Sequence, residues 1–327
     1  MKAVMNTRYG SPDGLEIQEV QRPEPTTDEV LVKIHASSVT RADSMMRQGI
    51  PHFGRLFLGL TKPKHPMTGT GFAGEVIEVG QDVSQYVVGD KVFGESVFGS
   101  GTNTEYICLS ETGMMAKLPE GMPYDAGASV CDGAVTSLNF LKNLACIQEG
   151  QQVLIYGASG SLGSAAVQIA KHYGAVVTGV CSANNMEMVK GLGADKIIDY
   201  QHEDFTAQGK TYDIIYDTVG KLSFSQCQKS LTEKGRYLSP ILSIPLFLKM
   251  LQTSICGSKK AKFSATGMLH ESELKEMLVE VRDMLQAGHL KTVIDRRYPL
   301  AKVAEAHRYV DTGHKRGNVI ISSALSL

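Results

Sequence analysis

The sequence has 327 residues, of which 43% are hydrophobic and 20% are charged, and its 33 basic side chains nearly balance 34 acidic ones. A chain of this length is longer than a single domain with one hydrophobic core usually is, which predicts two domains. The formal charge of −1, without a basic stripe, gives no sign of a nucleic-acid partner or an anionic membrane surface, so we expect neither. A small-molecule partner is favoured.

Six cysteines occur, at positions 108, 131, 146, 181, 227 and 256. They form no Cys-x-x-Cys pair and have no histidine at ligand spacing, which predicts reduced thiols and no zinc knuckle. Residues 1–6 contain no apolar signal core, and the most apolar stretch, 238–256, is interrupted by two prolines and Lys249. We therefore expect a cytoplasmic protein.

In the first hundred or so residues, short apolar segments alternate with turn-forming residues. Strands are predicted over 30–36, 72–79, 87–93 and 104–109. Turns such as Gly80-Gln81-Asp82 separate them. Many short strands separated by such turns are typical of a barrel or a folded-over sheet.

Near residue 125 the pattern changes, and strands begin to alternate with helices. Strands are predicted over 153–156, 175–180, 196–200 and 213–217, and helices over 161–173 and 184–192. Continuous apolar strands with intervening helices indicate a parallel sheet covered on both faces. We also predict an amphipathic helix over 271–287 and a final strand over 318–322. The segment Lys259-Lys260-Ala261-Lys262 is predicted to be a solvated turn.

The strongest chemical signal is a glycine-rich turn between a strand and a helix, Gly157-Ala158-Ser159-Gly160-Ser161-Leu162-Gly163. Ala158 and Gly160 let the main chain approach a pyrophosphate, and Gly163 lets the helix pack against its strand. The helix N-terminus offers free N–H groups and a partial positive charge to phosphates. Residues 158–163 are therefore predicted to bind a dinucleotide; the alternative is a tight turn without a ligand.

The end of the next strand favours NADPH over NADH. An NAD site has an acidic residue there, about 20 residues past the glycines, to hold the ribose hydroxyls. Here the strand runs into Cys181-Ser182-Ala183-Asn184-Asn185, and no acidic residue occurs before Glu187. Ser182 and Asn185 suit a 2′-phosphate, which a carboxylate would repel. The other interpretation of Ser182 is a helix N-cap.

Motifs spread over essentially the whole chain, at 32–39, 69–76, 89–93, 157–163, 192–195 and 217–220, resemble those of a known family. It is the medium-chain dehydrogenase/reductase superfamily, specifically its zinc-free quinone oxidoreductase (zeta-crystallin-like) branch. The resemblance implies an α/β fold with a GroES-like β-barrel domain and a Rossmann domain, a doubly wound parallel sheet. The barrel domain would comprise residues 1–122, completed by about 263–327, and the NADPH-binding Rossmann domain residues 123–262. A homodimer is also implied.

The zinc-dependent members of the superfamily hold their catalytic metal with an early Cys, a Gly-His-Glu segment and a later Cys. The corresponding places here resemble Thr40-Arg41-Ala42-Asp43, Gly69-Thr70-Gly71 and Cys131-Asp132-Gly133. Thr70 and Gly71 replace the His and Glu, and the four-cysteine lobe has no counterpart between Gly94 and Thr104. Because a catalytic zinc needs three protein ligands, we predict no metal.

The resemblance also implies cofactor contacts beyond the turn. In the family a small residue, a Lys and a Tyr hold the 2′-phosphate, and they correspond to Ser182, Asn185 and Tyr200, with Asn replacing the Lys and Cys181 adjoining them. The nicotinamide half of the cofactor is implied to contact Thr136, Thr218, Val219, Gly220 and Ser239. Asn318, near the final strand, is a further implied cofactor contact.

Hydride transfer without a metal favours a conjugated acceptor. Without zinc to stabilise a carbonyl oxygen, a quinone or an enone is the easier acceptor, because conjugation spreads the developing charge. Thr40 and Asp43 fall where the family often has an Asn and an Asp facing the nicotinamide. The Thr40 hydroxyl would hydrogen-bond the carbonyl, and the alternative source of the proton is water. The same Thr40-x-x-Asp43 spacing is a capping box that opens a short helix, and the two interpretations are compatible.

Together these features predict a zinc-independent, NADPH-dependent reductase of quinones or α,β-unsaturated carbonyls. One alternative is a 2-alkenal or enoyl-thioester reductase on the same scaffold. Another, from a different class, is a non-catalytic NADPH-binding redox sensor. The apolar segment 244–253 is either a substrate lid or a subunit contact.

Overall fold

The computed structural model describes residues 1–96 and 101–322, and its contacts divide the chain into two compact units. The first unit comprises Met1–Asp132, His270–Gln286 and Thr292–Leu327. The second comprises Gly133–Leu269 and Ala287–Lys291. No helix among the described residues is long and apolar enough to cross a membrane.

The first unit is built on a seven-stranded sheet that is antiparallel except for β14 and β15. Its strands are β3 (Glu29–Val39), β4 (Gly71–Val79), β5 (Lys91–Glu95), β6 (Tyr106–Ser110), β7 (Met115–Lys117), β14 (Ile294–Tyr298) and β15 (Asn318–Ser322). The order is β14-β15-β3-β4-β5-β7, with β6 also pairing with β3. The smaller pair, β1 (Lys2–Asn6) and β2 (Leu15–Glu19), is antiparallel. The predicted set of short strands is confirmed.

Alternate side chains of β3 belong to one buried hydrophobic cluster of this unit. Val30, Val32 and Ile34 are buried with residues such as Phe72 and Ile107 of neighbouring strands. The α-helices among the described residues of the unit are α1 (Arg41–Gln48), α2 (Arg55–Leu58), α3 (Tyr124–Ala128), α9 (Glu271–Gln286) and α10 (Val303–Asp311). The predicted amphipathic helix is α9, which buries one apolar face.

The strand predicted over 87–93 begins later than expected, at Lys91. Val87 and Val88 lie in the preceding turn and are 62% and 61% exposed. The Asp90 carboxylate accepts the Val87 N–H at 2.9 Å, and Gly89 has a φ of +95°. This local hydrogen bond and the left-handed backbone of Gly89 form a turn that outweighs the strand propensity of the valines.

The second unit is a six-stranded parallel sheet in the order β10-β9-β8-β11-β12-β13. Its strands are β8 (Gln152–Tyr156), β9 (Val176–Cys181), β10 (Lys196–Asp199), β11 (Tyr212–Asp217), β12 (Leu231–Leu238) and β13 (Lys260–Lys262). Its helices are α4 (Cys131–Leu138), which starts at the unit boundary, α5 (Ser161–His172), α6 (Met186–Gly191), α7 (Phe224–Cys227) and α8 (Ile244–Ile255). The order confirms the predicted doubly wound sheet.

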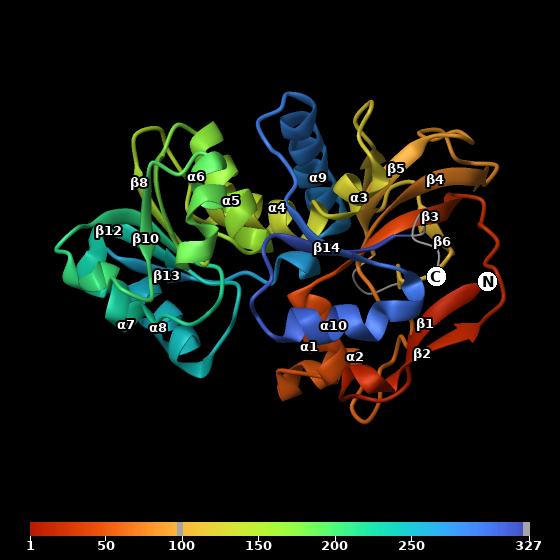
Figure 1. Ribbon diagram of the computed structural model, residues 1–327, viewed down its shortest axis with the longest axis horizontal. Helices are drawn as coiled ribbons and strands as arrows, with labels where there is room; N and C mark the ends of the chain where they lie inside the picture. Colours follow the sequence, from red (N-terminus) through yellow and green to blue (C-terminus); the bar gives the residue numbers. More distant parts are fainter. Residues whose placement is uncertain (97–100, 323–327) are drawn as a thin grey trace. The chain divides into compact units, whose positions relative to one another are not determined.

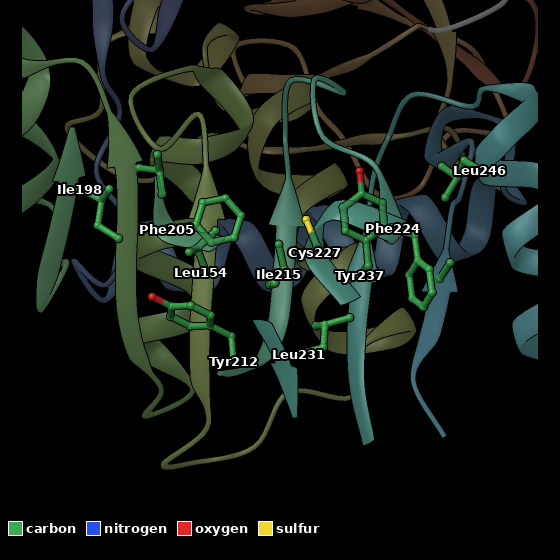
Figure 2. Packing of buried hydrophobic residues seen from close by; sticks show 12 residues of the cluster. Leu154, Ile198, Phe205, Tyr212, Ile215, Phe224, Cys227, Leu231, Tyr237 and Leu246 are labelled. Carbon is green, nitrogen blue, oxygen red and sulfur yellow. The ribbon is translucent and has the colours of Figure 1, made fainter. Parts of the chain in front are cut away.

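Successive strands are added to one side of β8 as far as β10, and from β11 onward they are added to its other side. Because parallel crossovers are right-handed, α5 and α6 lie on one face and α7 and α8 on the other (Figure 1). Strand and helix side chains form a buried cluster that includes Leu154, Ile215, Tyr237 and Leu246 (Figure 2). The carboxyl ends of β8, β9 and β11 therefore meet at one edge, where the predicted cofactor residues lie.

The prediction of a solvated turn at residues 259–262 is wrong, because residues 260–262 form the edge strand β13. Ala261 is 6% exposed and packs in the buried cluster that includes Tyr237 and Leu246. Arg236 and Tyr237 of β12 pair with Lys260 and Ala261. A single buried alanine between lysines does not produce the alternation of apolar and polar residues that predicts a strand. The structure of this segment is therefore decided by its pairing with β12.

The first unit buries His307 of α10 completely, at 0% exposure. Among the described residues, neither of its ring nitrogens has a hydrogen-bond partner. Arg47 of α1 is also buried and pairs with Asp311 at 2.6 Å. Burial, reinforced by the positive charge of Arg47, lowers the pKa of His307 from 6.5 to about 4, so the ring is neutral at pH 7.

We expect the free energy of unfolding to fall as the pH drops from 6.5 to about 4. In this range the unfolded ring binds a proton that the folded ring does not, a difference that amounts to about 3 kcal/mol once both rings are charged. Urea unfolding across this range measures it. His307→Phe should flatten the dependence, and His314→Phe, at an exposed ring, should keep it. An unchanged slope in His307→Phe would contradict the assignment.

Candidate functional site

The glycine-rich turn connects β8 to α5 and contains two positions that admit no side chain. Gly157 has a φ of +80°, and a Cβ there would lie 2.3 Å from Cγ2 of Val219. A Cβ on Gly163 would lie 2.1 Å from the Gly157 carbonyl oxygen and 2.7 Å from Cα of Ala158. The helix therefore packs directly on the turn, as expected for a dinucleotide-binding βαβ unit.

The N-terminus of α5 has no side-chain cap, because Gly160 occupies the N-cap position. The N–H groups of Gly157 and Ala158 both donate to the Val180 carbonyl at 3.0 Å, which ties the turn to β9. An uncapped helix start directs its first amides and its positive dipole end outward. Because the Gly160 N–H already donates to the Gly157 carbonyl at 3.0 Å, the local structure suits an anion held by the main-chain N–H groups of residues 161–163, at the start of α5.

Helix α4 packs against this helix start. A Cβ on Gly133 would lie 2.6 Å from the Ser161 hydroxyl, and the Ser137 hydroxyl donates to the Leu162 carbonyl at 2.9 Å. Thr136, a predicted cofactor residue, lies between these two contact positions and is half-buried. The structure therefore places Thr136 on the helix that supports the glycine-rich turn.

The residues predicted to recognise the 2′-phosphate come together. The Asn185 side-chain amide donates to the Ser159 hydroxyl at 3.1 Å and to the Ser182 hydroxyl at 3.2 Å. Ser182 occupies the N-cap position of a short 3-10 turn, as the other interpretation predicts, but its side chain makes no capping hydrogen bond. Asn185 instead bridges the glycine-rich turn to the end of β9, and three polar groups converge there.

Tyr200 and Cys181 lie at the same strand ends. The Tyr200 N–H donates to the Cys181 carbonyl at 3.2 Å, and the Tyr200 side chain is 48% exposed. The Cys181 thiol is buried, and burial raises its pKa to about 11, so it stays protonated at neutral pH. Tyr200 can contact a ligand with its ring, and Cys181 contributes through its backbone.

One carboxylate lies near this group, that of Asp199 at the end of β10. It accepts hydrogen bonds from His202 Nδ1 at 2.8 Å and from the Gln201 N–H at 3.1 Å. These bonds lower the pKa of Asp199, the His202 contact being the largest cause. The carboxylate is thus engaged by its own turn rather than directed at ribose hydroxyls.

The loop after β11 carries Thr218, Val219 and Gly220, and it is fastened to the glycine-rich turn. The Thr218 hydroxyl donates to the Tyr156 carbonyl at 2.8 Å. Gly220 has a φ of +73°, and a Cβ there would lie 2.7 Å from Ile241. The hydroxyl of Thr218 therefore holds the two loops together, while Val219 stays 38% exposed.

The buried carboxylate of Asp217 organises this loop, a role that the sequence reasoning missed. Asp217 is 0% exposed, and its oxygens accept from the N–H groups of Val219 (3.1 Å), Gly220 (2.8 Å) and Leu222 (2.7 Å). The Tyr237 hydroxyl lies 3.1 Å from the same carboxylate. Burial raises the pKa of Asp217, and the hydrogen bonds oppose that rise. The Asp-Thr-Val-Gly motif was the available signal.

Ser239 lies beside Gly220 along a cavity of about 320 Å³ in the second unit. Its hydroxyl accepts from the Ile241 N–H at 3.3 Å, and Tyr237, Leu246 and Ile244 also line the cavity. The structure thus brings the ends of β11 and β12 to one concave surface. Of the implied nicotinamide contacts, Thr218, Val219, Gly220 and Ser239 lie in the loops at these strand ends, whereas Thr136 lies on α4.

Thr40 and Asp43 belong to the first unit, and their predicted capping box is confirmed. The Asp43 N–H donates to the Thr40 hydroxyl at 3.0 Å, and the Asp43 carboxylate accepts the Thr40 N–H at 2.7 Å. The Thr40 hydroxyl also lies 2.8 Å from the same carboxylate. Both residues are buried at 3% exposure, so each already serves the start of α1.

Asn318 also lies in the first unit, at the start of β15. Its side-chain amide donates to the Val293 carbonyl at 3.1 Å, and its main-chain N–H donates to the same oxygen at 2.8 Å. The structure therefore uses Asn318 to join the segment before β14 to β15.

The described residues contain no group of three His, Cys, Asp or Glu side chains arranged to hold a metal ion. Gly71 stands where the zinc-dependent pattern has Glu, and a Cβ there would lie 2.5 Å from the Ser38 hydroxyl. The space for a glutamate is taken by β3 and by the Ala128 carbonyl, 3.2 Å from the same point.

Two family models and several known proteins match this chain. The model of the alcohol dehydrogenase GroES-like domain matches residues 26–120, and that of the zinc-binding dehydrogenases matches residues 192–321. The chloroplastic quinone oxidoreductase QR1 of Triphysaria versicolor is 31% identical over 98% of both chains. A quinone oxidoreductase structure from Coxiella burnetii shares 29% identity with a TM-score of 0.85, over 98% of this chain and 99% of that one. The Escherichia coli quinone oxidoreductase complexed with NADPH has a TM-score of 0.84 at 23% identity, over 98% and 100%.

Proposed function

Because this chain belongs to the zinc-free quinone oxidoreductase branch of the medium-chain dehydrogenase/reductase superfamily, we propose that it reduces quinones or α,β-unsaturated carbonyls with NADPH. The observation that carries the proposal is the contact of Gly163 with Gly157, beside an uncapped helix start. The coarser conclusion, a quinone oxidoreductase-like reductase that uses NAD(P)H, follows from the family itself.

The proposed cofactor site lies on the second unit. Residues 158–163 would hold the pyrophosphate, with main-chain amides at the start of α5 as the donors. The loop of Thr218, Val219 and Gly220, with Thr136 and Ser239, would hold the nicotinamide half. NADPH, when bound, supplies the hydride. Residues 123–262 are thus the proposed cofactor domain, and residues 1–122 with about 263–327 the proposed catalytic domain.

Thr40 and Asp43 remain the proposed polar residues on the catalytic side. The Thr40 hydroxyl donates its one proton to the Asp43 carboxylate at 2.8 Å, so the carboxylate orients the hydroxyl. To hydrogen-bond the carbonyl oxygen on which charge develops, the hydroxyl would have to turn this proton from Asp43 to the substrate. Asn318 is a proposed further contact of the cofactor.

The preference for NADPH rests on Ser159, Ser182 and Asn185, with the nearby Tyr200. The Asn185 amide donates to both hydroxyls, which leaves the hydroxyl protons to donate to a 2′-phosphate, and Asp199 is already engaged by His202. Asn185 stands where the family has a Lys, so the proposed recognition uses neutral donors.

Ser182→Asp is expected to weaken NADPH binding by about tenfold or more and to favour NADH. A carboxylate at this position repels the 2′-phosphate and can accept from ribose hydroxyls. Titration of both cofactors by nucleotide fluorescence measures the change. Ser182→Asn, of the same size but neutral, is the matched control and should keep the preference. A wild-type protein that prefers NADH would contradict the cofactor assignment.

Zinc independence is also part of the proposal, because Thr70 and Gly71 replace the ligands that zinc requires. Chelators such as EDTA or phenanthroline are expected to leave turnover with NADPH unchanged. Metal analysis of the purified protein gives a second readout. Loss of activity on chelation, restored by zinc, would show that this part of the proposal is wrong.

The substrate class is tested by a side-by-side assay of a naphthoquinone and a short 2-alkenal. We expect the quinone to be reduced with the higher kcat/KM. A clear preference for the alkenal would support the alternative of an alkenal or enoyl-thioester reductase. Intact NADPH binding without turnover of either class would support a redox sensor.

A homodimer and a cytoplasmic location complete the proposal. The six cysteines, all among the described residues, form no disulfide bond with one another, as expected in a reducing compartment. Light scattering after size-exclusion chromatography measures the molar mass against that of the 35.4 kDa chain.

A further inference from the structure

Two histidines from distant parts of the sequence meet on the surface of the second unit. His172 is the last residue of α5, and His289 lies in the segment 287–291 that follows α9. Both side chains are exposed, their ring centroids are 4.7 Å apart, and the ring planes form an angle of 46°. Within the described ranges 1–96 and 101–322, no other pair of histidine rings is in contact.

The nitrogen atoms of both rings are available to a ligand. Neither ring takes part in a hydrogen bond or an ion pair with any residue that the structure describes. Other exposed histidines are engaged, because Nδ1 of His202 contacts the Asp199 carboxylate and Nδ1 of His270 contacts the Ser272 hydroxyl. The imidazole nitrogen is the commonest protein ligand of metal ions. The pair therefore offers two such ligands to the solvent.

The backbone that carries the pair is fixed. Gln168 lies one helical turn before His172, on the same face of α5. Its side-chain amide donates to the Lys291 carbonyl at 3.0 Å, and its side-chain oxygen accepts the Lys291 N–H at 2.8 Å. Leu290, next to His289, is 4% exposed. Both imidazoles thus extend from anchored backbone, so bringing them together costs little conformational entropy.

The spacing of the rings fits two ligands of one metal ion. A ligating nitrogen lies about 2.1 Å from the ion, which places the ring centre about 3.2 Å from it. At an angle of about 90° to 110° at the ion, two such ring centres are about 4.5 to 5.2 Å apart. The observed 4.7 Å lies in this range. The angle of 46° between the planes is neither the parallel nor the perpendicular arrangement that ring packing alone prefers.

The charges around the pair are compatible with a bound cation. His172 lies in the last turn of α5, where the unpaired carbonyls give the helix end a partial negative charge. The ammonium group of the neighbouring Lys171 is 2.9 Å from the Asp195 carboxylate, which balances its charge. Lys291 is exposed, and no described residue holds its ammonium group near the rings.

We propose that His172 and His289 together bind one divalent transition-metal ion of the class of Ni²⁺, Cu²⁺ and Zn²⁺, with water as the remaining ligands. Imidazole suits these ions, whereas Mg²⁺ and Ca²⁺ need oxygen ligands. The ion joins the end of α5 to the segment 287–291. The site goes beyond the function proposed above and lies about 16 Å along α5 from the glycine-rich turn. The prediction of no metal concerned a catalytic zinc with three protein ligands, and this site has two.

Calorimetric titration of the full chain with NiCl₂ tests the proposal without NADPH or substrate, so its outcome is independent of the proposed function. We expect one ion per chain, tighter binding of Ni²⁺ than of Co²⁺, and no binding of Mg²⁺ at the same concentrations. Saturating Ni²⁺ should raise the unfolding midpoint by about 2 °C or more, because the ion binds the folded chain.

Substitutions of the two rings identify the ligands. His172→Gln and His289→Gln should each lower the affinity for Ni²⁺ by about tenfold or more, and the double substitution should lower it little further, because one ion needs both rings. His314→Gln, at an exposed histidine of the first unit, is the matched control and should leave the affinity unchanged. Unfolding midpoints without metal confirm that each variant is folded.

The exposed thiols of Cys146 and Cys256 are the competing ligands on the described surface. Cys146→Ser with Cys256→Ser should keep the affinity for Ni²⁺. In this thiol-depleted protein, the electron paramagnetic resonance spectrum of bound Cu²⁺ should show two nitrogen ligands.

Three results would overturn the proposal. The first is a wild-type protein that takes up no Ni²⁺ at millimolar concentrations. The second is equal affinity in wild type, His172→Gln and His289→Gln. The third is a loss of affinity that occurs only when Cys146 and Cys256 are replaced.

Discussion

Gly163→Val is expected to abolish measurable NADPH binding and to lower the free energy of unfolding by about 3 kcal/mol. The first added atom, Cβ, would lie 2.1 Å from the Gly157 carbonyl oxygen and 2.7 Å from Cα of Ala158. Both neighbours are backbone atoms of the glycine-rich turn, so no side chain can rotate away. Helix α5 must move off the turn, and the amides at its start then lose their common direction.

The measurement is a fluorescence titration with NADPH, together with circular dichroism to establish how much protein is folded. Gly191→Val in α6 is the matched control, because a Cβ at Gly191 meets nothing within 4 Å. This control should bind NADPH as the wild type does. A folded Gly163→Val protein that retains NADPH affinity would contradict the role given to the turn.

Asp217→Asn is expected to cost about 3 kcal/mol of stability and to weaken NADPH binding by about tenfold. The carboxylate accepts the N–H groups of Val219, Gly220 and Leu222. An amide has the same size but replaces one acceptor oxygen by an NH₂ donor. In a fully buried site that donor must face another donor, and the loop of residues 218–220 loses its shape.

Urea unfolding and NADPH titration of the same samples measure the two effects. Tyr237→Phe removes a single hydroxyl from the carboxylate and leaves the backbone donors in place. It should lower the free energy of unfolding by about 1 kcal/mol and leave NADPH affinity within about twofold. If Asp217→Asn is as mild as Tyr237→Phe, the carboxylate does not organise the loop.

The parts that the sequence could predict are those with a local physical cause. The glycine-rich turn could be identified from the sequence because only small residues fit where Gly163 contacts Gly157. The capping box of Thr40 and Asp43 is readable because its two hydrogen bonds span three residues. Strands β8, β9 and β11 are continuous apolar runs, and their identification predicts a doubly wound sheet.

The parts that the sequence could not predict depend on contacts between distant segments. Strand β13 forms because Ala261 packs on a core assembled from several elements. The lysines on either side of Ala261 leave no hydrophobic pattern in the sequence that would predict a strand. Asp217 resembles an ordinary strand-end acid until β12 brings Tyr237 to it, 20 positions away. Asn185 likewise reaches Ser159 across 26 positions, a contact that only the fold creates.

Equilibrium titration of the purified protein with NADPH and with NADH tests the central claim most directly. Saturable binding of one NADPH per chain, tighter than NADH, is the expected result, and Gly163→Val should remove it. A purified, folded protein without measurable affinity for either nucleotide would contradict the account.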